Sequence, residues 1–294
     1  TAELSSNTFQ LLSEAGLTLL EAAPVLIDAR FRAAQLKKIS NPDVREYFES
    51  RYNRASEGLQ AVTRDALLNK ITPLTSDPHF RHLFGQASTF SVPEALDRGC
   101  WILLDSNKGR LGEHSATVVS LFVSKLKNSI FARKNRKPYT INLDELQTLA
   151  GLEETIKILL SEARKFAVSV CTANQFLEQH SPQMRAALLS IGTHVIFQVS
   201  PSDAEKFASA FGGGRSLTEL LKNLPPRQFV IKSGHFPVIR GQASDLQKPR
   251  ADYSDLLLRS RARFARKRAD VEREIRARRS LLSPKSQETL HDWE

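Results

Sequence analysis

The spacing of apolar residues separates a helical first third of the chain from a mixed remainder. In residues 1–92, apolar positions recur at helical spacing, as in Val25, Ile27 and Phe31, which is typical of a buried helix face. Asn41-Pro42 is a helix start, with proline at the first helical position. We expect helices over 41–54, 56–70 and 77–84 and no strand, so that 1–92 forms a helical subdomain.

From Gly99 onward, short continuous apolar runs alternate with helical segments. Such runs are typical of strands buried in a parallel sheet. The predicted strands lie at 100–105, 139–143, 166–172 and 194–199, and a hairpin follows at 228–232 and 237–240. The helices between them lie at 115–133, 152–165, 182–189 and 201–211. This alternation predicts an α/β fold, with a mostly parallel sheet and helices on both faces.

The end of the chain changes character again. Residues 246–294 are polar at first and then helical and basic, with Ser283-Pro284 breaking the helix. We therefore expect three parts, namely the helical subdomain at 1–92, an α/β domain at 93–245 and a basic helical tail at 246–294.

The distribution of charge along the chain indicates a class of binding partner. The net charge is +10 and the pI about 9.7, and the segment 259–279 alone holds ten Lys or Arg against three acids. A basic segment of this kind indicates a polyanion, most simply DNA. The candidate DNA-binding residues are Arg261, Arg263, Arg266, Lys267 and Arg268. The alternative is a solvated helix in which Asp270, Glu272 and Glu274 pair with neighbouring arginines.

Several features of the sequence indicate where in the cell the protein is found. No apolar run is long enough to span a membrane, and no basic-then-apolar leader opens the chain. Because Thr1 is not an initiator methionine, we expect the chain to begin inside a longer protein. Cys100 and Cys171 lie in apolar runs, and we interpret them as reduced core residues of a cytoplasmic protein.

Two polar sequences follow neighbouring predicted strands and form the candidate active site. Asp144-Glu145 ends the first strand, and Asn174-Gln175 follows the next. Ligands of open α/β sheets bind at the carboxyl edge, where an acid can help hold Mg²⁺, a second can polarise a water, and an amide can orient it. The alternative is that the acids only cap the next helix. No G-x-x-x-x-G-K-[ST] phosphate loop occurs in the 294 residues.

Cations and glycines elsewhere suggest further candidates. Arg164 ends the helix between the two strands, where it either complements the helix dipole or reaches a neighbouring subunit's nucleotide, with Arg185 as the second candidate. The loop 107–113 is basic and contains glycine, so it either approaches phosphates or is a plain turn. We interpret the glycines of 211–215 as a helix terminator. For His79 and His82 we reject a metal site, because no other ligand is evident.

Five sequences in this order resemble the HerA/FtsK superfamily of ring-forming DNA translocases. They are Trp101-Ile-Leu-Leu-Asp-Ser-Asn-Lys-Gly-Arg-Leu-Gly112, Asn142-Leu-Asp-Glu-Leu-Gln147, Leu160-Ser-Glu-Ala-Arg-Lys-Phe166, Thr172-Ala-Asn-Gln175 and Val199-Ser-Pro-Ser-Asp-Ala204. Within that superfamily the chain is most similar to the conjugative coupling proteins of type IV secretion, the TraG/TraD kind. The resemblance covers about residues 95–210.

The resemblance implies a RecA-like P-loop fold and a homo-hexameric motor that uses ATP and Mg²⁺ to pump DNA. It implies Mg²⁺ coordination through water for Asp144, water activation for Glu145, γ-phosphate sensing for Gln175 and a trans role for Arg164. It places the phosphate loop and any inner-membrane anchor upstream, so the chain alone is expected to be inactive. Type IV secretion or relaxosome proteins are the implied partners. The alternatives are a non-catalytic DNA-binding or docking subunit of the same fold, and a HerA-like DNA-processing helicase partner.

Overall fold

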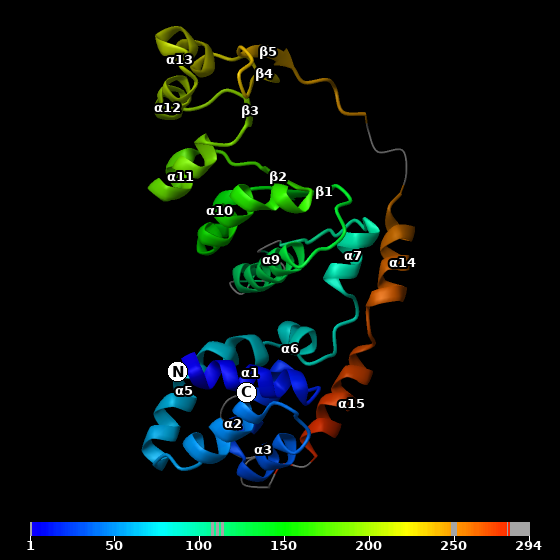
Figure 1. Ribbon diagram of the computed structural model, residues 1–294. Helices are drawn as coiled ribbons and strands as arrows, with labels where there is room; N and C mark the ends of the chain where they lie inside the picture. Colours follow the sequence, from blue (N-terminus) through cyan, green and yellow to red (C-terminus); the bar gives the residue numbers. More distant parts are fainter. Residues whose placement is uncertain are drawn as a thin grey trace. The chain divides into compact units, whose positions relative to one another are not determined.

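The computed structural model describes residues 2–106, 109, 112, 115–247, 252–280 and 282. These residues form two compact units (Figure 1). Unit 1 combines Thr1–Phe90 with Tyr253–Glu294, and unit 2 is Ser91–Asp252. The boundary between Phe90 and Ser91 lies close to the predicted boundary at residue 92. The sequence suggested that the basic C-terminal segment forms a third part, but this segment joins unit 1.

Unit 1 contains helices and no strand among its described residues, as predicted. The predicted helix starts are confirmed, because the Asn41 side chain accepts hydrogen bonds from the backbone N–H groups of Asp43 and Val44, and Ser56 caps the next helix through Leu59. The elements are α1 (Ala2–Glu14), η1 (Leu19–Glu21), α2 (Ala22–Ile27), α3 (Ala29–Leu36), α4 (Pro42–Glu46), η2 (Tyr47–Tyr52), α5 (Glu57–Thr75), α6 (Pro78–Phe84), α14 (Ser254–Phe264) and α15 (Arg268–Arg279).

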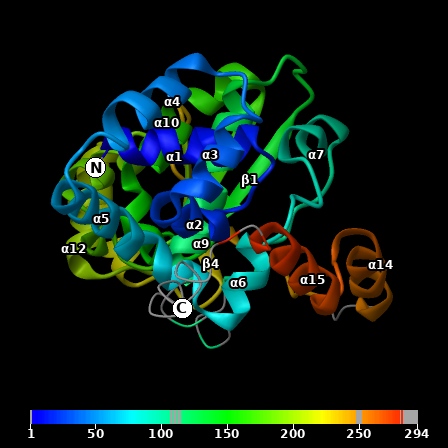
Figure 2. The same ribbon diagram turned by 90° about the horizontal axis from the view of Figure 1, so that it is seen from below.

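The C-terminal helix α15 packs against α6 and η1, and Figures 1 and 2 show α15 beside α6. Val271 and Ile275 are buried in a cluster with Leu20. The Arg278 guanidinium lies 3.0 Å from the carboxylate of Glu21, which is fully buried. A buried carboxylate needs such a partner, because desolvation of an unpaired charge is costly. The basic segment therefore belongs to the architecture of unit 1.

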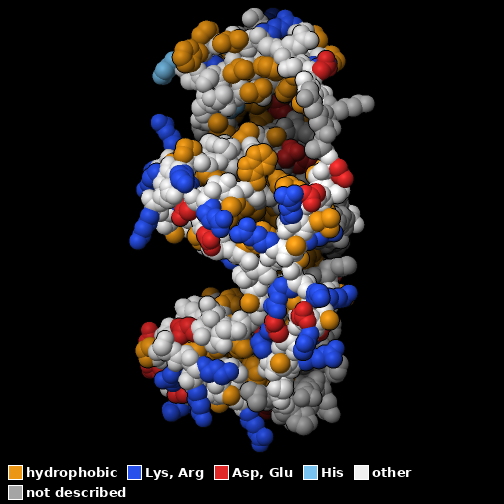
Figure 3. Space-filling view, turned by 90° about the vertical axis from the view of Figure 1, so that its right-hand side faces the viewer, with side chains coloured by type: hydrophobic (Ala, Val, Ile, Leu, Met, Phe, Trp, Pro, Cys, Tyr) orange, Lys and Arg blue, Asp and Glu red, His pale blue; other side chains and the backbone are white. Residues whose placement is uncertain are grey.

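Several cations in and just before α15 form ion pairs, so part of the salt-bridged alternative is correct. Arg266 pairs with Glu274, and Arg273 pairs with Asp270. Glu272 lies 2.7 Å from the imidazole of His82. In Figure 3, Lys and Arg side chains of unit 1 accordingly lie beside Asp and Glu side chains. These pairs lower the number of cations that remain for an external partner.

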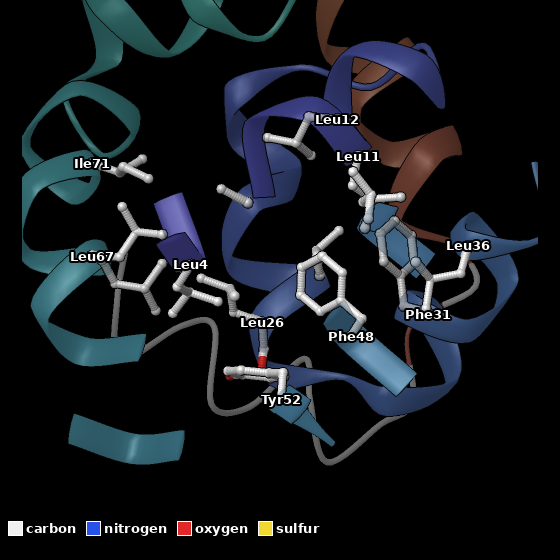
Figure 4. Packing of buried hydrophobic residues seen from close by; sticks show 14 of the residues in the cluster. Leu4, Leu11, Leu12, Leu26, Phe31, Leu36, Phe48, Tyr52, Leu67 and Ile71 are labelled. Carbon is white, nitrogen blue, oxygen red and sulfur yellow. The ribbon is translucent and has the colours of Figure 1, made fainter. Parts of the chain in front are cut away.

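The core of unit 1 brings α1, α3 and η2 together. Leu11, Phe31 and Phe48 have no exposed surface, and burial of each such side chain contributes about 1.5–3 kcal/mol. In Figure 4, Leu11, Phe31 and Leu36 lie together in this cluster. The Tyr52 hydroxyl donates a hydrogen bond of 3.1 Å to the carbonyl of Leu26, so that this buried polar group is satisfied.

Gly85 gives a test of the packing of α15. A Cβ at this position would lie 2.6 Å from the Arg81 carbonyl oxygen and 2.8 Å from the Ile275 side chain. Because backbone cannot yield, Gly85→Ala should cost about 1–3 kcal/mol and loosen α15. Hydrogen–deuterium exchange of α15 should then become faster. Gly58→Ala is the control, since its Cβ would meet nothing within 4 Å. Unchanged exchange in Gly85→Ala would contradict this packing.

Unit 2 contains all the strands of the described chain, and the α/β class is confirmed. The parallel part is a pair, β1 and β2, and the remaining strands form an antiparallel sheet in the order β3-β4-β5. The strands are β1 (Tyr139–Leu143), β2 (Val168–Thr172), β3 (Thr193–Ile196), β4 (Gln228–Ser233) and β5 (Ile239–Gln242). The predicted hairpin is confirmed as β4–β5, whereas the strand predicted at 194–199 pairs antiparallel with β4.

Helices of unit 2, among them α9 (Ser115–Phe131) and α10 (Glu153–Glu162), cover one face of the parallel pair. Ile141 and Val168 are buried in a cluster with side chains of α9 and α10, while Thr140, Asn142, Ser169 and Cys171 on the opposite face are exposed. Cys171 is thus a surface residue and not the core residue expected. The helices are α7 (Val92–Arg98), α9 (Ser115–Phe131), η4 (Leu146–Leu152), α10 (Glu153–Glu162), η5 (Ala163–Phe166), η6 (Leu177–Gln179), α11 (Pro182–Leu189), α12 (Pro201–Phe211) and α13 (Gly214–Lys222).

The strand predicted at 100–105 is wrong for this structure. Residues 100–105 belong to no helix or strand, and Trp101 and Leu103 are 91% and 84% exposed. The apolar run predicts burial, but no described strand pairs with it. Val195 and Ile239 of the antiparallel sheet, and Phe197 just after β3, are also exposed. Figure 3 shows hydrophobic side chains on the surface of unit 2.

Among the described residues, no helix is both long enough and apolar enough to cross a membrane.

Candidate active site

The two parallel strands end side by side, which brings the candidate residues to one edge of the sheet. Leu143 is in register with Thr172, and the ladder continues beyond the strands. The Ala173 N–H donates to the Leu143 carbonyl at 2.9 Å, and the Leu146 N–H donates to the Ala173 carbonyl at 2.9 Å. Asp144-Glu145 and Asn174-Gln175 therefore leave the sheet at the same carboxyl edge, as predicted.

Glu145 occupies a tight turn that presents both acids to solvent. Its φ of 48° is in the left-handed region, which costs a residue with a Cβ of order 1–3 kcal/mol. The turn is held by the Glu145 N–H, which donates to Asp144 Oδ1 at 3.0 Å, and by the Thr148 N–H, which donates to the Glu145 carbonyl at 2.8 Å. Leu146 is 1% exposed and anchors the turn in the core. Both carboxylates are exposed.

Neither acid forms an ion pair with another described residue, and Glu145 carries a positive φ. Carboxylate oxygens suit Mg²⁺, which is usually bound by one or two carboxylates together with waters and substrate phosphates. No cluster of three or more His, Cys, Asp or Glu forms a closed metal site among the described residues. The residues present thus fit an open Mg²⁺ site and not a metal cage.

Gln175 is exposed at the same edge, and the segment after it is held by a buried carboxylate. Asp203, in the first turn of α12, is 1% exposed. Its Oδ2 accepts a hydrogen bond of 3.0 Å from the Leu177 N–H. Ser200 caps α12 by accepting from the Asp203 N–H at 3.2 Å. Asp203 is thus a residue that the sequence did not identify, although the Ser200-Pro-Ser-Asp203 helix start was a visible signal.

A second polar contact joins α12 to the same segment. The Ser202 hydroxyl donates to Glu178 at 2.6 Å, and the Lys206 ammonium donates to the same carboxylate at 3.1 Å. These hydrogen bonds, first that of Ser202 and then that of Lys206, lower the pKa of Glu178 below its ordinary value. The backbone that carries Gln175 is therefore attached to α12 through Asp203 and Glu178.

His180 lies in the same segment after Gln175 and contacts α10. Its side chain is almost fully buried, and Nδ1 lies 3.7 Å from the carboxylate of Glu153. Burial lowers the pKa of His180, and the charge of Glu153 only partly opposes this effect. The Ser181 N–H also donates to Glu153 at 3.1 Å. The neutral imidazole therefore packs as part of the scaffold that joins α10 to the Gln175 segment.

Arg164 lies at the opposite edge of the sheet from the acids. It belongs to η5, the turn that precedes β2, and its side chain is exposed. The five residues of β2 span about 16 Å at about 3.3 Å per residue, which is farther than an arginine side chain extends. Arg164 therefore cannot reach the acids of its own chain along the strands. Arg185 is half-buried in α11, and its charge contributes to the lowered pKa of Glu178.

The remaining candidate residues either have structural roles or lie outside the described residues. Gly212 ends α12 with a φ of 69°, and the helix-terminator interpretation of 211–215 is confirmed. His82 pairs with Glu272 in unit 1. Of the loop 107–113, only Gly109 and Gly112 are described, so its role lies outside the described residues.

The candidate DNA-binding cations lie in and after α14. Arg261 and Arg263 are exposed on this helix, which has no buried residue. Arg266 pairs with Glu274, while the Arg268 guanidinium lies 3.3 Å from His82 Nε2. Lys267 is exposed just before α15. The five residues thus differ in how much of their charge remains for a partner.

The fold and site define an α/β protein with paired acids at the carboxyl edge of a parallel strand pair. The structure is similar to VirB4 of Thermoanaerobacter pseudethanolicus, with 14% identity and a TM-score of 0.42, over 76% of this chain and 73% of that one. It is also similar to the bacterial conjugative coupling protein TrwBΔN70, solved in a trigonal form in complex with sulphate, with 17% identity and a TM-score of 0.49.

The second similarity covers 83% of this chain and 64% of the TrwBΔN70 chain, so this chain spans just under two thirds of that structure. No family model matches the sequence, and no curated protein matches it significantly.

Proposed function

We propose that this chain is the acid-bearing part of an ATP-driven DNA translocase of the conjugative coupling kind. The observation that carries the proposal is the register of β1 and β2, which brings Asp144, Glu145 and Gln175 to one carboxyl edge. Nucleotides bind at such edges in open α/β sheets. A phosphate loop from outside the 294 residues would complete the site, since this sequence contains none.

Each residue has a role in the hydrolysis of ATP. Asp144 would hold Mg²⁺ through water, and the ion would neutralise charge on the β- and γ-phosphates. The exposed carboxylate of Glu145 accepts the proton of the attacking water. The Gln175 amide hydrogen-bonds the γ-phosphate and that water, so that it reports whether ATP is present.

The proposal extends to the assembly. Arg164 lies at the amino edge, away from the acids of its own chain, and this position favours a role at the site of a neighbouring copy in a hexameric ring. Arg185 is the second candidate for this role. The exposed cations around α14, together with Arg266 and Arg268, would contact DNA phosphates. Type IV secretion or relaxosome proteins are the proposed partners, and the motor would work in the cytoplasm, at the inner membrane through an upstream segment.

ATP turnover tests this proposal directly. The 294-residue chain should show only background hydrolysis, because the backbone N–H groups and lysine of a phosphate loop are missing. A longer protein that adds the upstream strand and phosphate loop should hydrolyse ATP, and DNA should stimulate it. Malachite-green assays of both proteins, with and without DNA, measure this difference.

Two results would overturn the proposal. Robust turnover by residues 1–294 alone would show that the nucleotide is held in another way. A longer protein whose upstream sequence contains no phosphate loop, and which binds DNA without turnover, would favour the non-catalytic docking subunit. The missing phosphate loop in these 294 residues is the observation that keeps this second function in consideration. The third function, a HerA-like helicase partner, would act on DNA ends and would not transport DNA.

A further inference from the structure

Cations gather at the amino edge of the parallel strand pair, opposite the acids. The loop before β1 carries Arg133, Lys134, Arg136 and Lys137, and the turn before β2 carries Arg164 and Lys165. Because β1 and β2 are parallel and in register from Tyr139 and Val168, these two segments meet at one edge. We call the three exposed cations Lys134, Arg136 and Lys137 the amino-edge surface.

The loop before β1 is held in place by Arg133. Its side chain is 1% exposed and lies 3.3 Å from the carboxylate of Asp97 in α7. The same guanidinium donates to the Lys137 carbonyl at 2.9 Å, which closes the loop. The Asn135 side chain accepts from the Lys137 N–H at 3.0 Å. The cations on this loop are therefore displayed by a fixed backbone, which lowers the entropy lost on binding.

Arg136 joins the loop to the turn before β2. Its guanidinium donates to the Lys165 carbonyl at 2.6 Å and lies 5.0 Å from the centre of the Phe166 ring. Phe166 in turn stacks on Phe131 at 5.1 Å. This arrangement keeps a planar, permanently charged group at the surface, and guanidinium groups suit phosphate recognition.

Charge at this surface is not balanced by acids. Asp97 pairs with Arg133, and Glu162 lies 3.2 Å from the Lys165 ammonium. Within the described part of the chain, no carboxylate lies within ion-pair distance of Lys134, Arg136 or Lys137. This distinguishes the surface from α15 and the residues just before it, where Arg266, Arg273 and Arg278 all have acidic partners.

We propose that the amino-edge surface binds the phosphate backbone of DNA. Fixed, unpaired cations give the electrostatic, sequence-independent part of DNA binding. None of the exposed large hydrophobic side chains among the described residues belongs to these two segments, so the surface has nothing to insert into a lipid layer. The face of Phe166 is occupied by Arg136, so the contacts would be to phosphates and not to stacked bases.

This surface goes beyond the proposed motor activity and is tested separately from it. Binding at equilibrium needs no nucleotide, no Mg²⁺ and no turnover. It also lies in unit 2, whereas the DNA-binding cations predicted from the sequence lie in unit 1. A protein that never hydrolyses ATP could still bind DNA in this way, and a failure of either proposal would leave the other intact.

The test measures how the affinity of the 294-residue chain for a fluorescein-labelled DNA duplex depends on salt. Lys134→Ala/Lys137→Ala should weaken binding by roughly tenfold at low salt and lower the log–log salt slope by about 1.8, or about 0.9 for each phosphate contact. Neither side chain takes part in the hydrogen bonds that hold the loop, so the fold should be unchanged. Lys37→Ala/Lys38→Ala is the matched control, because it removes two adjacent exposed lysines from unit 1.

A third variant, Arg261→Ala/Arg263→Ala, measures the contribution of α14 in the same assay. The proposal holds if the amino-edge variant lowers the slope and the control does not. It is overturned if the amino-edge variant and the control bind DNA alike. It is also overturned if the amino-edge variant keeps its DNA affinity but loses binding to phosphatidylserine vesicles, because the surface would then recognise a membrane.

Discussion

In the longer protein that carries a phosphate loop, Arg164→Ala should lower ATP turnover by about 10³–10⁵-fold while nucleotide affinity and folding change little. The reason is the position of Arg164 at the amino edge, out of reach of the acids in its own chain. In a closed ring this edge can face the γ-phosphate of a neighbour, where a guanidinium stabilises the charge of the transition state. Single-turnover and steady-state ATPase assays measure the loss.

Mixed rings decide whether the arginine acts in trans. Neither Arg164→Ala nor Glu145→Gln subunits should be active alone. When the two are mixed, some interfaces pair an intact Glu145 with an intact Arg164 of the neighbour, so activity should partly return. If Arg164 acted within its own chain or only ended its helix, mixing would restore nothing.

Lys165→Ala is the control for this experiment. Lys165 is the next residue, is exposed and pairs with Glu162 at 3.2 Å. Exposed pairs of this kind contribute little, and a flexible ammonium is easily replaced by water. Lys165→Ala should therefore be mild. Small and equal losses at both positions would contradict the finger role and leave Arg164 as a cation at a helix end.

The sequence predicted the edge of the site well because the relevant signals are local. An apolar run that ends in Asp144-Glu145, and a second that ends before Asn174-Gln175, are enough to place four polar residues at one edge once the strands are parallel. Helix starts were predictable for the same reason, since Asn41 and Ser56 cap through residues two or three positions away. Strand ends and helix caps therefore depend on residues that are close together in the sequence.

Long-range partners could not be predicted in this way. The ten cations of 259–279 suggested a free basic tail, but Arg278 pairs with Glu21, which lies far away in sequence. Likewise, Asp203 holds Leu177, and no periodicity connects the two. We predicted a strand at 100–105 because the run is apolar and should favour burial. A strand also needs a partner strand in register, and this segment has none among the described residues. Such pairings depend on the whole fold.

The largest effect expected from a residue outside the acids and Arg164 is that of Asp203. Asp203→Ala in the longer protein removes the acceptor of the Leu177 N–H, two residues after Gln175. A buried donor left without a partner costs about 1–3 kcal/mol, so the Gln175 segment should shift. A displacement of about 1 Å in such a group can lower kcat by about 10²-fold. We expect this loss in kcat with little change in KM, because Asp203 is a positioning residue that does not touch the nucleotide.

Asp203→Asn separates positioning from charge. The amide oxygen of asparagine can still accept the Leu177 N–H, so kcat should recover to within a few-fold of the unchanged protein, although the 3.5 Å approach of Lys206 loses its charge partner. Hydrogen–deuterium exchange at residues 174–180 should rise in Asp203→Ala and stay low in Asp203→Asn. If both variants lost the same activity, the negative charge and not the hydrogen bond would hold the segment. If exchange rose in Asp203→Ala while kcat stayed constant, Gln175 would have no part in hydrolysis.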